Sequence, residues 1–568
     1  MKTIFEYIRP KLGVMSFQML IKFIGTIVEL LLPWMLSVIL DDLAPVKNVK
    51  MIWLWGSLMV ICAVIALIFN AMANRMATAI SKDITRRVRR DLFIRITALT
   101  ASQEDHFTTP SLITRLSSDT YNMHQMIDRM QRLGVRAPIL MLGGIVLTFS
   151  LEPVLTNVLL AALPLLALVI WLVSKYGIRL YMTSQSLLDA LIRRAQESMA
   201  GIRVIQALSK TDYEAERFEK ANKDVTQKER QTDNLMNITS PTMNLLLNTG
   251  LTAVVVAGAY RVNAGLTQPG VIIAFLSYFT IILNALMMVS RLFILYSRGV
   301  ASANRVAEIL NAPYEMKIIE MPLNKDDCHI KFNNVSFSYN KVRNNIADIS
   351  FELRRGETLG IIGPTGSGKS TVLQLLLRFY DADAGEIYLN GKDIRSVPVD
   401  VLHNVFGVVF QNDFLYSGEI GENIDFGRGL GKEAVEIAAS NAQADFISAY
   451  DEKFCARLAP KGANISGGQK QRILLARALA ANSEIILLDD SSSALDYKTD
   501  AKIREALAHG FSDATKIIVA QRISSIRGAD KILVLENGRT AGFGAHDELM
   551  EHCESYREIY RIQMGDVV

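Results

Sequence analysis

The chain has 568 residues, which is too long for a single soluble core, so we expect several domains. Its 61 basic and 57 acidic residues give a net charge of +4, and this near balance gives no general case for nucleic-acid binding. The four cysteines, Cys62, Cys328, Cys455 and Cys553, show no CxxC spacing, which indicates neither a zinc site nor a disulfide framework. The hydropathy is uneven: residues 1–300 hold long apolar runs, and the remainder is typical of a soluble α/β domain.

Six stretches reach the length of a membrane-spanning helix, for which about 20 mostly apolar residues are needed. The predicted spans are residues 15–40, 51–75, 134–152, 155–177, 241–262 and 270–297.

The loops between these spans alternate in length and charge. Residues 76–133 and 178–240 form long loops rich in Lys and Arg, whereas the other loops are short. Basic loops stay cytoplasmic, so the long loops and both termini are predicted on that side, as helices that continue out of the membrane. The basic run near Arg86–Arg90 could bind RNA or anionic lipid, but a solvated helix face is the simpler interpretation.

Charged residues are few inside the predicted spans, and two of them stand out. Glu29 is in the first span, near Pro33, and Arg291 is in the sixth. A charge at bilayer depth is unfavourable and usually faces a cavity or a partner. Glu29 and Arg291 are therefore candidate substrate-contacting residues, with structural pairing between helices as the alternative.

A P-loop follows the membrane part. Residues 363–370 read Gly-Pro-Thr-Gly-Ser-Gly-Lys-Ser, which matches G-x-x-x-x-G-K-[ST], between an apolar strand-like segment and a helix-like one. The glycines let backbone N–H groups surround a phosphate, Lys369 binds the β- and γ-phosphates, and Ser370 ligates Mg²⁺. The pattern predicts an ATP and Mg²⁺ site, with nucleotide contacts from Gly363, Thr365, Gly366, Ser367, Gly368, Lys369, Ser370 and Thr371.

Two further segments indicate a nucleotide site. Ser466-Gly467-Gly468-Gln469 offers small residues at the start of a predicted helix, where unpaired N–H groups and the helix dipole favour an anion. Residues 484–490 run from an apolar stretch into Asp489 and Asp490. This pattern predicts a buried parallel strand that delivers two carboxylates to its C-terminal edge, where open α/β sheets bind ligands.

The P-loop, the Ser-Gly-Gly-Gln segment and the strand ending in Asp, in this order, resemble the nucleotide-binding domain of an ABC protein. Together with the six spans and two long cytoplasmic loops, the whole chain resembles an ABC exporter half-transporter. The resemblance implies a membrane α-helical domain with six transmembrane helices and long cytoplasmic extensions in residues 1–300. It implies a linker in residues 301–325 and a C-terminal α/β P-loop nucleotide-binding domain in residues 326–568.

The resemblance also implies roles for single residues. Tyr339 matches the aromatic residue that stacks on adenine, and Gln411 matches the glutamine that senses Mg²⁺ and the attacking water. Asp489 matches the carboxylate that holds Mg²⁺ through water, so the implied metal site is Ser370, Gln411 and Asp489. Ser466, Gly467, Gly468 and Gln469 match the signature that faces ATP across a dimer, and residues 493–496 match the D-loop.

The chain departs from the family pattern at two catalytic positions. Asp490 stands where the family has a Glu general base, and it is one methylene shorter than Glu, which hinders reach to the water. Gln521 stands where the family has a switch histidine, and an amide cannot titrate near neutral pH. In addition, Pro460 replaces a common Glu before the signature, and Ile465 replaces a common Leu. The alternative is that Asp490 and Gln521 are tolerated variants in an active site.

The resemblance therefore implies the degenerate-site subunit of a heterodimeric bacterial ABC exporter of the multidrug type. Its partner would be a second half-transporter with Glu and His at the catalytic positions. Its cargo would be amphipathic small molecules, drugs or lipids, exported across the cytoplasmic membrane without any role for nucleic acid. The alternative is a regulatory or channel-like ABC subunit that binds ATP and hydrolyses little. In the family the loop tips dock on the nucleotide-binding domains, a role that we predict for residues 111–117 and 211–216, with ordinary surface turns as the alternative.

Overall fold

The structure is a computed structural model that describes residues 2–313, 316, 318, 319, 321 and 328–564. Its contacts divide the chain into two compact units: residues 1–98 with 108–312, and residues 99–107 with 313–568. The predicted linker, 301–325, begins inside a helix that continues to Leu310. Within that linker, residues 314, 315, 317, 320 and 322–325 lie outside the described residues.

The first unit is built of helices. They are α1 (Lys2–Ile8), α2 (Leu12–Val38), α3 (Val49–Thr97), α5 (Thr109–Thr114), α6 (Thr120–Leu151), α7 (Pro153–Ala200), α8 (Ile202–Ala207), α9 (Thr211–Asn263) and α10 (Pro269–Leu310), with the short turns η1 (Arg9–Lys11), η2 (Ile39–Leu43) and η3 (Arg115–Asp119).

Several of these helices are much longer than a membrane is thick. The 49 residues of α3 would extend over roughly 74 Å at 1.5 Å per residue, against a hydrocarbon core of about 30 Å. Among the described residues, five helical stretches are long and apolar enough to cross a membrane, and residues 153–169 at the start of α7 form a shorter apolar helix. The predicted spans therefore fall in helices, and the long extensions predicted in residues 76–133 and 178–240 include the continuations of α3, α6, α7 and α9.

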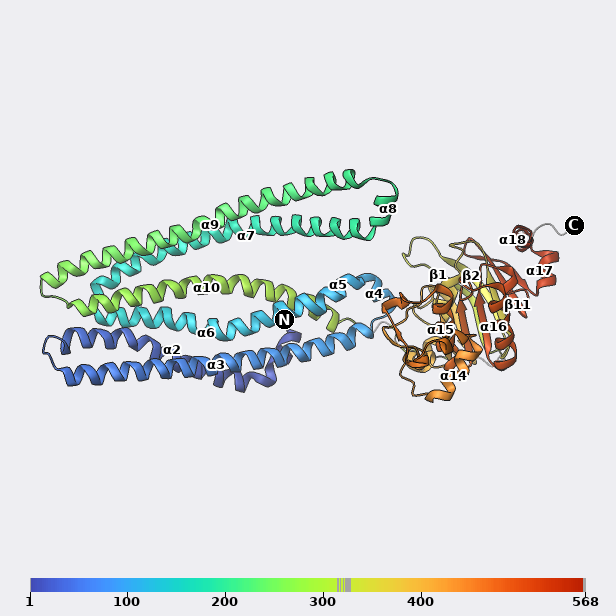
Figure 1. Ribbon diagram of the computed structural model, residues 1–568, viewed down its shortest axis with the longest axis horizontal. Helices are drawn as coiled ribbons and strands as arrows, with labels where there is room; N and C mark the ends of the chain where they lie inside the picture. Colours follow the sequence, from blue (N-terminus) through green and yellow to red (C-terminus); the bar gives the residue numbers. More distant parts are fainter. Residues whose placement is uncertain (1, 314–315, 317, 320, 322–327, 565–568) are drawn as a thin grey trace. The chain divides into compact units, whose positions relative to one another are not determined.

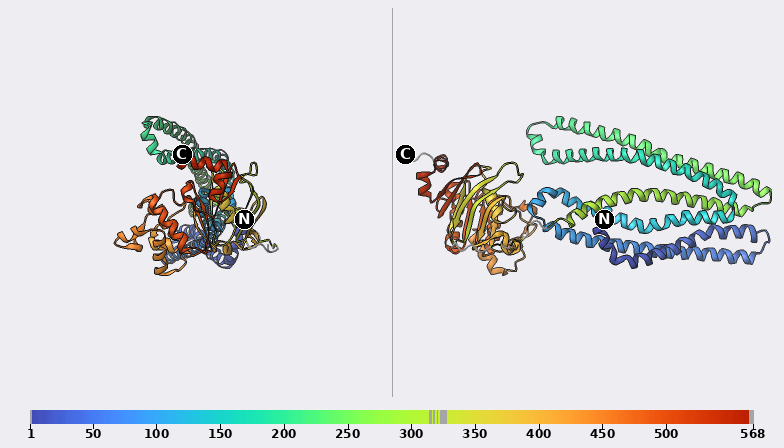
Figure 2. Two further views of the ribbon diagram at one scale, coloured as in Figure 1. Left: turned by 90° about the vertical axis from the view of Figure 1, so that its right-hand side faces the viewer. Right: turned by 180° about the vertical axis from the view of Figure 1, so that it is seen from behind.

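The helices pack in pairs, α2 with α3, α6 with α10, and α7 with α9, and α8 forms the tip that joins α7 to α9 (Figure 1, Figure 2). Glycines allow α6 and α10 to approach closely: a Cβ on Gly144 would lie 2.7 Å from Ile282, and one on Gly299 would lie 2.4 Å from Met126. At one end of the unit, the Asp41 carboxylate accepts the Gly270 and Val271 N–H groups at the start of α10 at 2.6 and 2.8 Å. This bond stabilises the positive end of that helix.

The second unit contains three sheets within the described residues. A four-stranded antiparallel sheet has the order β2-β1-β4-β5, a six-stranded sheet has the order β12-β11-β3-β10-β9-β6, and β7 pairs with β8. The strands are β1 (Ile330–Phe337), β2 (Ile346–Leu353), β3 (Thr358–Ile362), β4 (Ala384–Leu389), β5 (Lys392–Asp393), β6 (Phe406–Val409), β7 (Gly418–Glu419), β8 (Arg457–Leu458), β9 (Ile485–Asp489), β10 (Thr515–Val519), β11 (Lys531–Glu536) and β12 (Arg539–Gly544).

The second unit also contains helices and short turns. They are α4 (Ala101–Phe107), α11 (Lys369–Leu376), α12 (Val399–His403), α13 (Ile420–Asp425), α14 (Gly431–Asn441), α15 (Gly467–Ala480), α16 (Tyr497–Gly510), α17 (His546–His552) and α18 (Glu554–Met564), with η4 (Ile394–Ser396), η5 (Asp445–Ala449), η6 (Lys453–Cys455), η7 (Pro460–Gly462) and η8 (Ile523–Ser525).

The order of the parallel strands positions the predicted site. Strands β3, β10, β9 and β6 are neighbours and run parallel to one another, so their carboxyl ends meet at one edge of the sheet. The P-loop follows β3, Asp489 ends β9, Gln521 follows β10 and Gln411 follows β6. The strands predicted before the P-loop and before Asp490 are confirmed, and every residue of β9 is buried.

Candidate nucleotide site

The P-loop has the strand–loop–helix geometry that phosphate binding requires. Gly368 caps α11 with φ of 100°, and a Cβ there would lie 2.5 Å from Ile346, so a larger residue does not fit. The Lys369 ammonium donates to the carbonyl oxygens of Gly363 and Pro364, both at 2.8 Å, which holds the cation over the loop. Burial lowers the pKa of Lys369, and the nearby Asp489 and Asp490 carboxylates oppose that shift.

The two hard oxygen donors of the predicted Mg²⁺ site lie together. Asp489 accepts a hydrogen bond from the Ser370 hydroxyl at the carboxyl end of β9. Burial raises the pKa of Asp489, while the Ser370 hydroxyl lowers it. Hydroxyl and carboxylate oxygens are the donors that Mg²⁺ prefers, so this pair fits the ion. Gln411, the third predicted ligand, is exposed two residues after β6.

Asp490 and Gln521 bind each other. The Gln521 side-chain amide donates to Asp490 Oδ2 at 3.0 Å. The backbone of Asp490 has φ of 51°, in the left-handed region, and its N–H donates to the Val519 carbonyl at 2.9 Å. Burial raises the pKa of Asp490, whereas the charges of Arg522 and Lys369 lower it. The structure therefore joins the residues at the two catalytic positions where the sequence departs from the pattern of the family that it resembles.

Helix α18 braces the loop that carries Gln521. Gln563 donates from its side chain to the Gln521 carbonyl at 2.6 Å and accepts from the Ile523 N–H at 2.7 Å. Sequence reasoning did not find Gln563, because a polar residue near the end of a chain gives no signal of its partner.

The signature segment begins helix α15, as predicted. Ser466 is the N-cap, its hydroxyl accepts the Gln469 N–H at 3.3 Å, and the Gln469 side chain accepts the Ser466 N–H at 2.9 Å. This reciprocal capping box orders the first turn, where Gly467 and Gly468 lie. Gln471, which sequence reasoning missed, donates to Ser493 Oγ at 3.0 Å and accepts from the Ala494 N–H at 3.0 Å, so it joins the signature helix to the D-loop.

The structure does not bring all predicted nucleotide residues together. Among the described residues, no hydrogen bond or ion pair links residues 466–469 to residues 363–371.

Pro460 begins the turn η7, followed by Lys461 with φ of 62°, and Ile465 is partly buried against the core.

Tyr339 lies beside the P-loop helix. Its hydroxyl donates to the Gln374 side chain, and it lies 3.3 Å from Thr371 Oγ1. Its ring packs edge-on against Tyr380, with 5.1 Å between the ring centroids, and it is 42% exposed. An exposed ring held next to the P-loop can stack on a base.

Helix α4 belongs to the same unit and contacts this aromatic group. The Tyr380 hydroxyl donates to the Asp105 carboxylate at 2.7 Å, and Gln103 donates to the Pro313 carbonyl at 2.8 Å. Burial and the bond to Asp105 hold the pKa of Tyr380 well above its ordinary value. A cavity of about 260 Å³ lies here, lined in part by Asp105, Tyr339 and Tyr380. Tyr380 thus touches both the predicted adenine-stacking residue and α4.

The segment whose contacts group it with the nucleotide-binding unit is α4, whereas residues 108–312 belong to the helical unit. The docking role predicted for residues 111–117 stays a prediction. Arg115 pairs with Glu308 of α10 at 2.7 Å. Residues 108–110 begin helix α5: Thr108 is its N-cap, and Pro110 lies in its first turn, where Pro is favoured. Residues 211–216 form the first turns of α9, and their docking role stays a prediction.

The Tyr380–Asp105 bond predicts an effect on α4. Replacing Tyr380→Phe removes the hydroxyl and keeps the ring, so α4 should lose about 1 kcal/mol of local stabilisation. Backbone amides of α4 should then exchange about fivefold faster in hydrogen–deuterium exchange. Tyr388→Phe is the matched control, because the Tyr388 hydroxyl donates to Glu386 on β4 instead. Equal exchange of α4 in both variants would contradict the prediction.

Of the two charges predicted to contact substrate, Glu29 has a partner inside the helical unit. Its carboxylate accepts from Arg136 of α6 at 2.6 Å, which is the structural pairing kept as the alternative. Arg291 of α10 is exposed.

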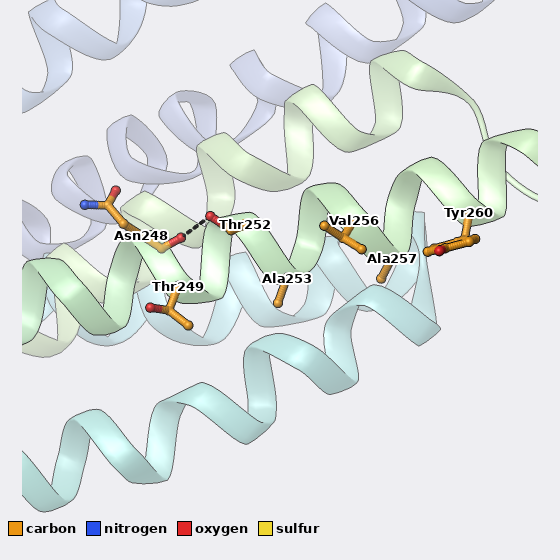
Figure 3. A pocket seen from close by; sticks show the side chains of 7 residues that line it. All are labelled: Asn248, Thr249, Thr252, Ala253, Val256, Ala257 and Tyr260. Carbon is orange, nitrogen blue, oxygen red and sulfur yellow. Dashed lines mark hydrogen bonds between the residues drawn. The ribbon is translucent and has the colours of Figure 1, made fainter.

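A large open hollow lies elsewhere in the helical unit. It has a volume of about 760 Å³, and Figure 3 shows its lining side chains on α9. They are Asn248, Thr249, Thr252, Ala253, Val256, Ala257 and Tyr260. The lining is uncharged and includes neither Glu29 nor Arg291.

Comparison with known proteins agrees with this geometry. The ABC transporter transmembrane region matches residues 15–286, and the ABC transporter domain matches residues 346–493. The chain is 33% identical over 568 residues to the uncharacterized ABC transporter ATP-binding protein YfiB of Bacillus subtilis (strain 168), covering 100% of this chain and 99% of YfiB. It is 31% identical over 574 residues to Rv1273c, an uncharacterized ABC transporter ATP-binding protein of Mycobacterium tuberculosis, covering 97% and 96% of the two chains.

A solved structure has the same fold. A bacterial Atm1-family ABC exporter with ATP bound superposes with a TM-score of 0.83 over 99% of both chains, at 24% sequence identity. At that identity the likeness shows the fold: an N-terminal helical transmembrane domain followed by an α/β nucleotide-binding domain. The full-length match to relatives above 30% identity shows the family. The chain belongs to the ABC transporters, carries its transmembrane domain and its ATP-binding domain on one polypeptide, and has the fold of an ABC exporter.

Proposed function

We propose that this chain is one half of a heterodimeric exporter that moves amphipathic small molecules, drugs or lipids, across the cytoplasmic membrane of a bacterium. It would contribute a degenerate ATP site and the signature that completes its partner's active site. Both termini would lie in the cytoplasm, because the basic loops are on that side.

The hydrogen bond from Gln521 to Asp490 carries this proposal. A general base must reach the attacking water within hydrogen-bond distance. Asp490 is shorter than Glu, and one of its oxygens accepts the Gln521 amide at 3.0 Å. The side-chain N–H donor of Gln521 is thus bonded to the Asp490 carboxylate of the same chain. The bond engages one oxygen of Asp490, and the side chain carries the other oxygen less far toward an attacking water than Glu would, which should slow water activation.

ATP binding should survive in the same site. Lys369, Ser370 and Asp489 are grouped at the carboxyl edge of the sheet, and Tyr339 is held beside the P-loop helix. Mg²⁺ would be held by Ser370 and Asp489, and Gln411 is the proposed third contact. When bound, the ion would neutralise phosphate charge.

The signature supports a partner. Its capping box is intact, and its N-terminal turn is built to face an anion. Because residues 466–469 make no bond to this chain's own P-loop, they are available to a second nucleotide-binding domain. A partner with Glu and His at the catalytic positions would then supply the catalytic residues of the active site, and Ser466 and Gly467 of this chain would complete it.

The proposal predicts that the chain alone hydrolyses ATP poorly. Purified in lipid without another subunit, it should bind ATP but turn over far below the roughly 10 per second that is typical of enzymes. Copurification from native membranes with mass spectrometry would identify the partner, and adding that partner should restore turnover. Hydrolysis by the isolated chain at enzymatic rates would contradict the heterodimer.

A regulatory or channel-like ABC subunit is the second candidate, and the same Asp490–Gln521 bond favours it. Flux of a labelled amphiphile against its gradient in vesicles that contain the complex would distinguish the two. Export requires uphill flux that depends on ATP, whereas a channel permits only downhill flux.

A further inference from the structure

A belt of polar side chains runs along the face that α2, α3 and α6 share. On each helix these residues are three, four or seven positions apart, except for the adjacent Gln131 and Arg132, so they lie on one side of it. The polar belt consists of Gln18, Lys22 and Glu29 on α2; Asn74, Thr78 and Ser81 on α3; and Asp128, Gln131, Arg132 and Arg136 on α6.

The belt residues are connected across the three helices. At one end, Gln131 donates to Ser81 Oγ at 3.2 Å, and in the middle Arg132 pairs with Asp128 at 3.1 Å and donates to Thr78. At the other end, Arg136 pairs with Glu29 at 2.6 Å. Each carboxylate of the belt thus already has an arginine.

Lys22 is the cation that remains. It is 2% exposed, and its ammonium donates to the neutral Asn74 side chain at 3.1 Å. Within the described part of the chain it makes no ion pair, and the belt holds three cations against two carboxylates. A buried charge without a counter-ion is strongly unfavourable, and in a membrane helix such a charge usually faces a partner or substrate.

The belt also has spare donors near an accessible face. The side chains of Arg136 and Glu29 are 30% and 29% exposed, and that of Arg132 is 27% exposed. The buried Nε atoms of Arg132 and Arg136 find no acceptor among the described residues. The unmatched acceptors of the belt, the side-chain oxygens of Gln18 and Gln131, are neutral and lie at the other end. Positive charge and free donors therefore coincide around Lys22, Arg132 and Arg136.

We propose that the polar belt binds the anionic group, carboxylate or phosphate, of an amphipathic molecule, with Lys22 as its principal counter-charge. The identification of that molecule as cargo rests on the proposed export function. The carboxylate of Glu29 alone would suggest a cationic cargo. Glu29 instead pairs with Arg136, so it competes with the bound anionic group for that arginine. The anionic group could belong to a transported acid or to an anionic lipid headgroup, and the two sources can be separated.

Binding is measured directly on the full-length chain, in the assembly in which it is purified, in phosphatidylcholine nanodiscs. The probes are a fluorescent dodecanoic acid and the dodecylamine that carries the same fluorophore, with empty nanodiscs as the background. The wild-type protein should bind the acid at least about tenfold more tightly than the amine, because a charge-assisted hydrogen bond accounts for a factor of this size. The assay needs neither ATP nor transport. It therefore tests anion binding by the belt independently of the export proposal.

Three variants test the role of Lys22. Lys22→Met should lose the preference for the acid, and Glu29→Gln should tighten acid binding several-fold by freeing Arg136. Arg75→Met is the matched control, because Arg75 follows Asn74 on α3 but is exposed, and it should leave both affinities unchanged. Equal binding of acid and amine by the wild type, or an unchanged preference in Lys22→Met, would overturn the proposal. If Lys22→Met does not fold, absence of tightening in Glu29→Gln would overturn it.

The lipid composition separates the two sources. In nanodiscs that contain phosphatidylglycerol, a site for lipid headgroups predicts weaker binding of the acid probe to the wild type, because the lipid competes. A site for a transported acid predicts the same affinity in both lipids. Either result supports anion binding by the belt and assigns its source.

Discussion

Gly467→Asp should reduce ATP turnover of the assembled exporter on the order of 100-fold, the scale of losing electrostatic stabilisation in an active site. The substitution places a carboxylate in the first turn of α15, at the positive helix end where the partner's γ-phosphate is proposed to lie. Folding should not suffer, because a Cβ at this position would meet Ala494 at 3.6 Å, an ordinary van der Waals contact.

Two further variants are controls. One separates the effect of the added charge from that of side-chain size, and the other separates the contributions of the two ATP sites. Gly467→Asn has nearly the same shape without the charge and should cost much less turnover. Asp490→Ala should also cost little, because Asp490 is held by Gln521 and contributes little base catalysis. Single-turnover assays on the three complexes decide it. If Asp490→Ala abolishes turnover as thoroughly as Gly467→Asp, the degenerate-site assignment is wrong.

The nucleotide-binding elements could be predicted from the sequence because their signals are local. The apolar strand before Gly363, the strand ending at Asp489 and the helix start at Ser466 each lie within a few residues of the motif they position. Parallel strands bring their carboxyl ends together, so three motifs that are far apart in the sequence could be assigned to one fold.

Contacts between distant side chains could not be predicted in this way. The partner of Glu29 is Arg136, which is 107 residues away, and no periodicity on α2 reveals it. Similarly, Asp105 and Tyr380 are separated by 275 residues, and the sequence around α4 does not indicate this contact. The Gln521–Asp490 bond follows from β9 and β10 being neighbours in the sheet, which the strand pattern alone does not specify.

Restoring the family's residues should activate this chain's own ATP site. The double variant Asp490→Glu with Gln521→His lengthens the base by one methylene and removes the amide that occupies the carboxylate. A well-placed general base contributes about 10²–10⁴-fold, so turnover at this site should rise by at least about 100-fold. To isolate this site, the catalytic Glu that we propose for the partner is replaced by Gln, which should inactivate the other ATP site.

The single variants show whether the pair acts as a unit. With Gln521→His alone, Asp490 is released but remains too short, and with Asp490→Glu alone the longer carboxylate can still accept the Gln521 amide. Each single change should therefore raise turnover less than tenfold, and the double variant should exceed the product of the two, as coupled residues do. Steady-state ATP hydrolysis by the four complexes is the measurement. If the double variant stays as slow as the parent, then features beyond Asp490 and Gln521, such as the loop at Pro460, limit this site, and the bond between the two residues is not what makes it degenerate.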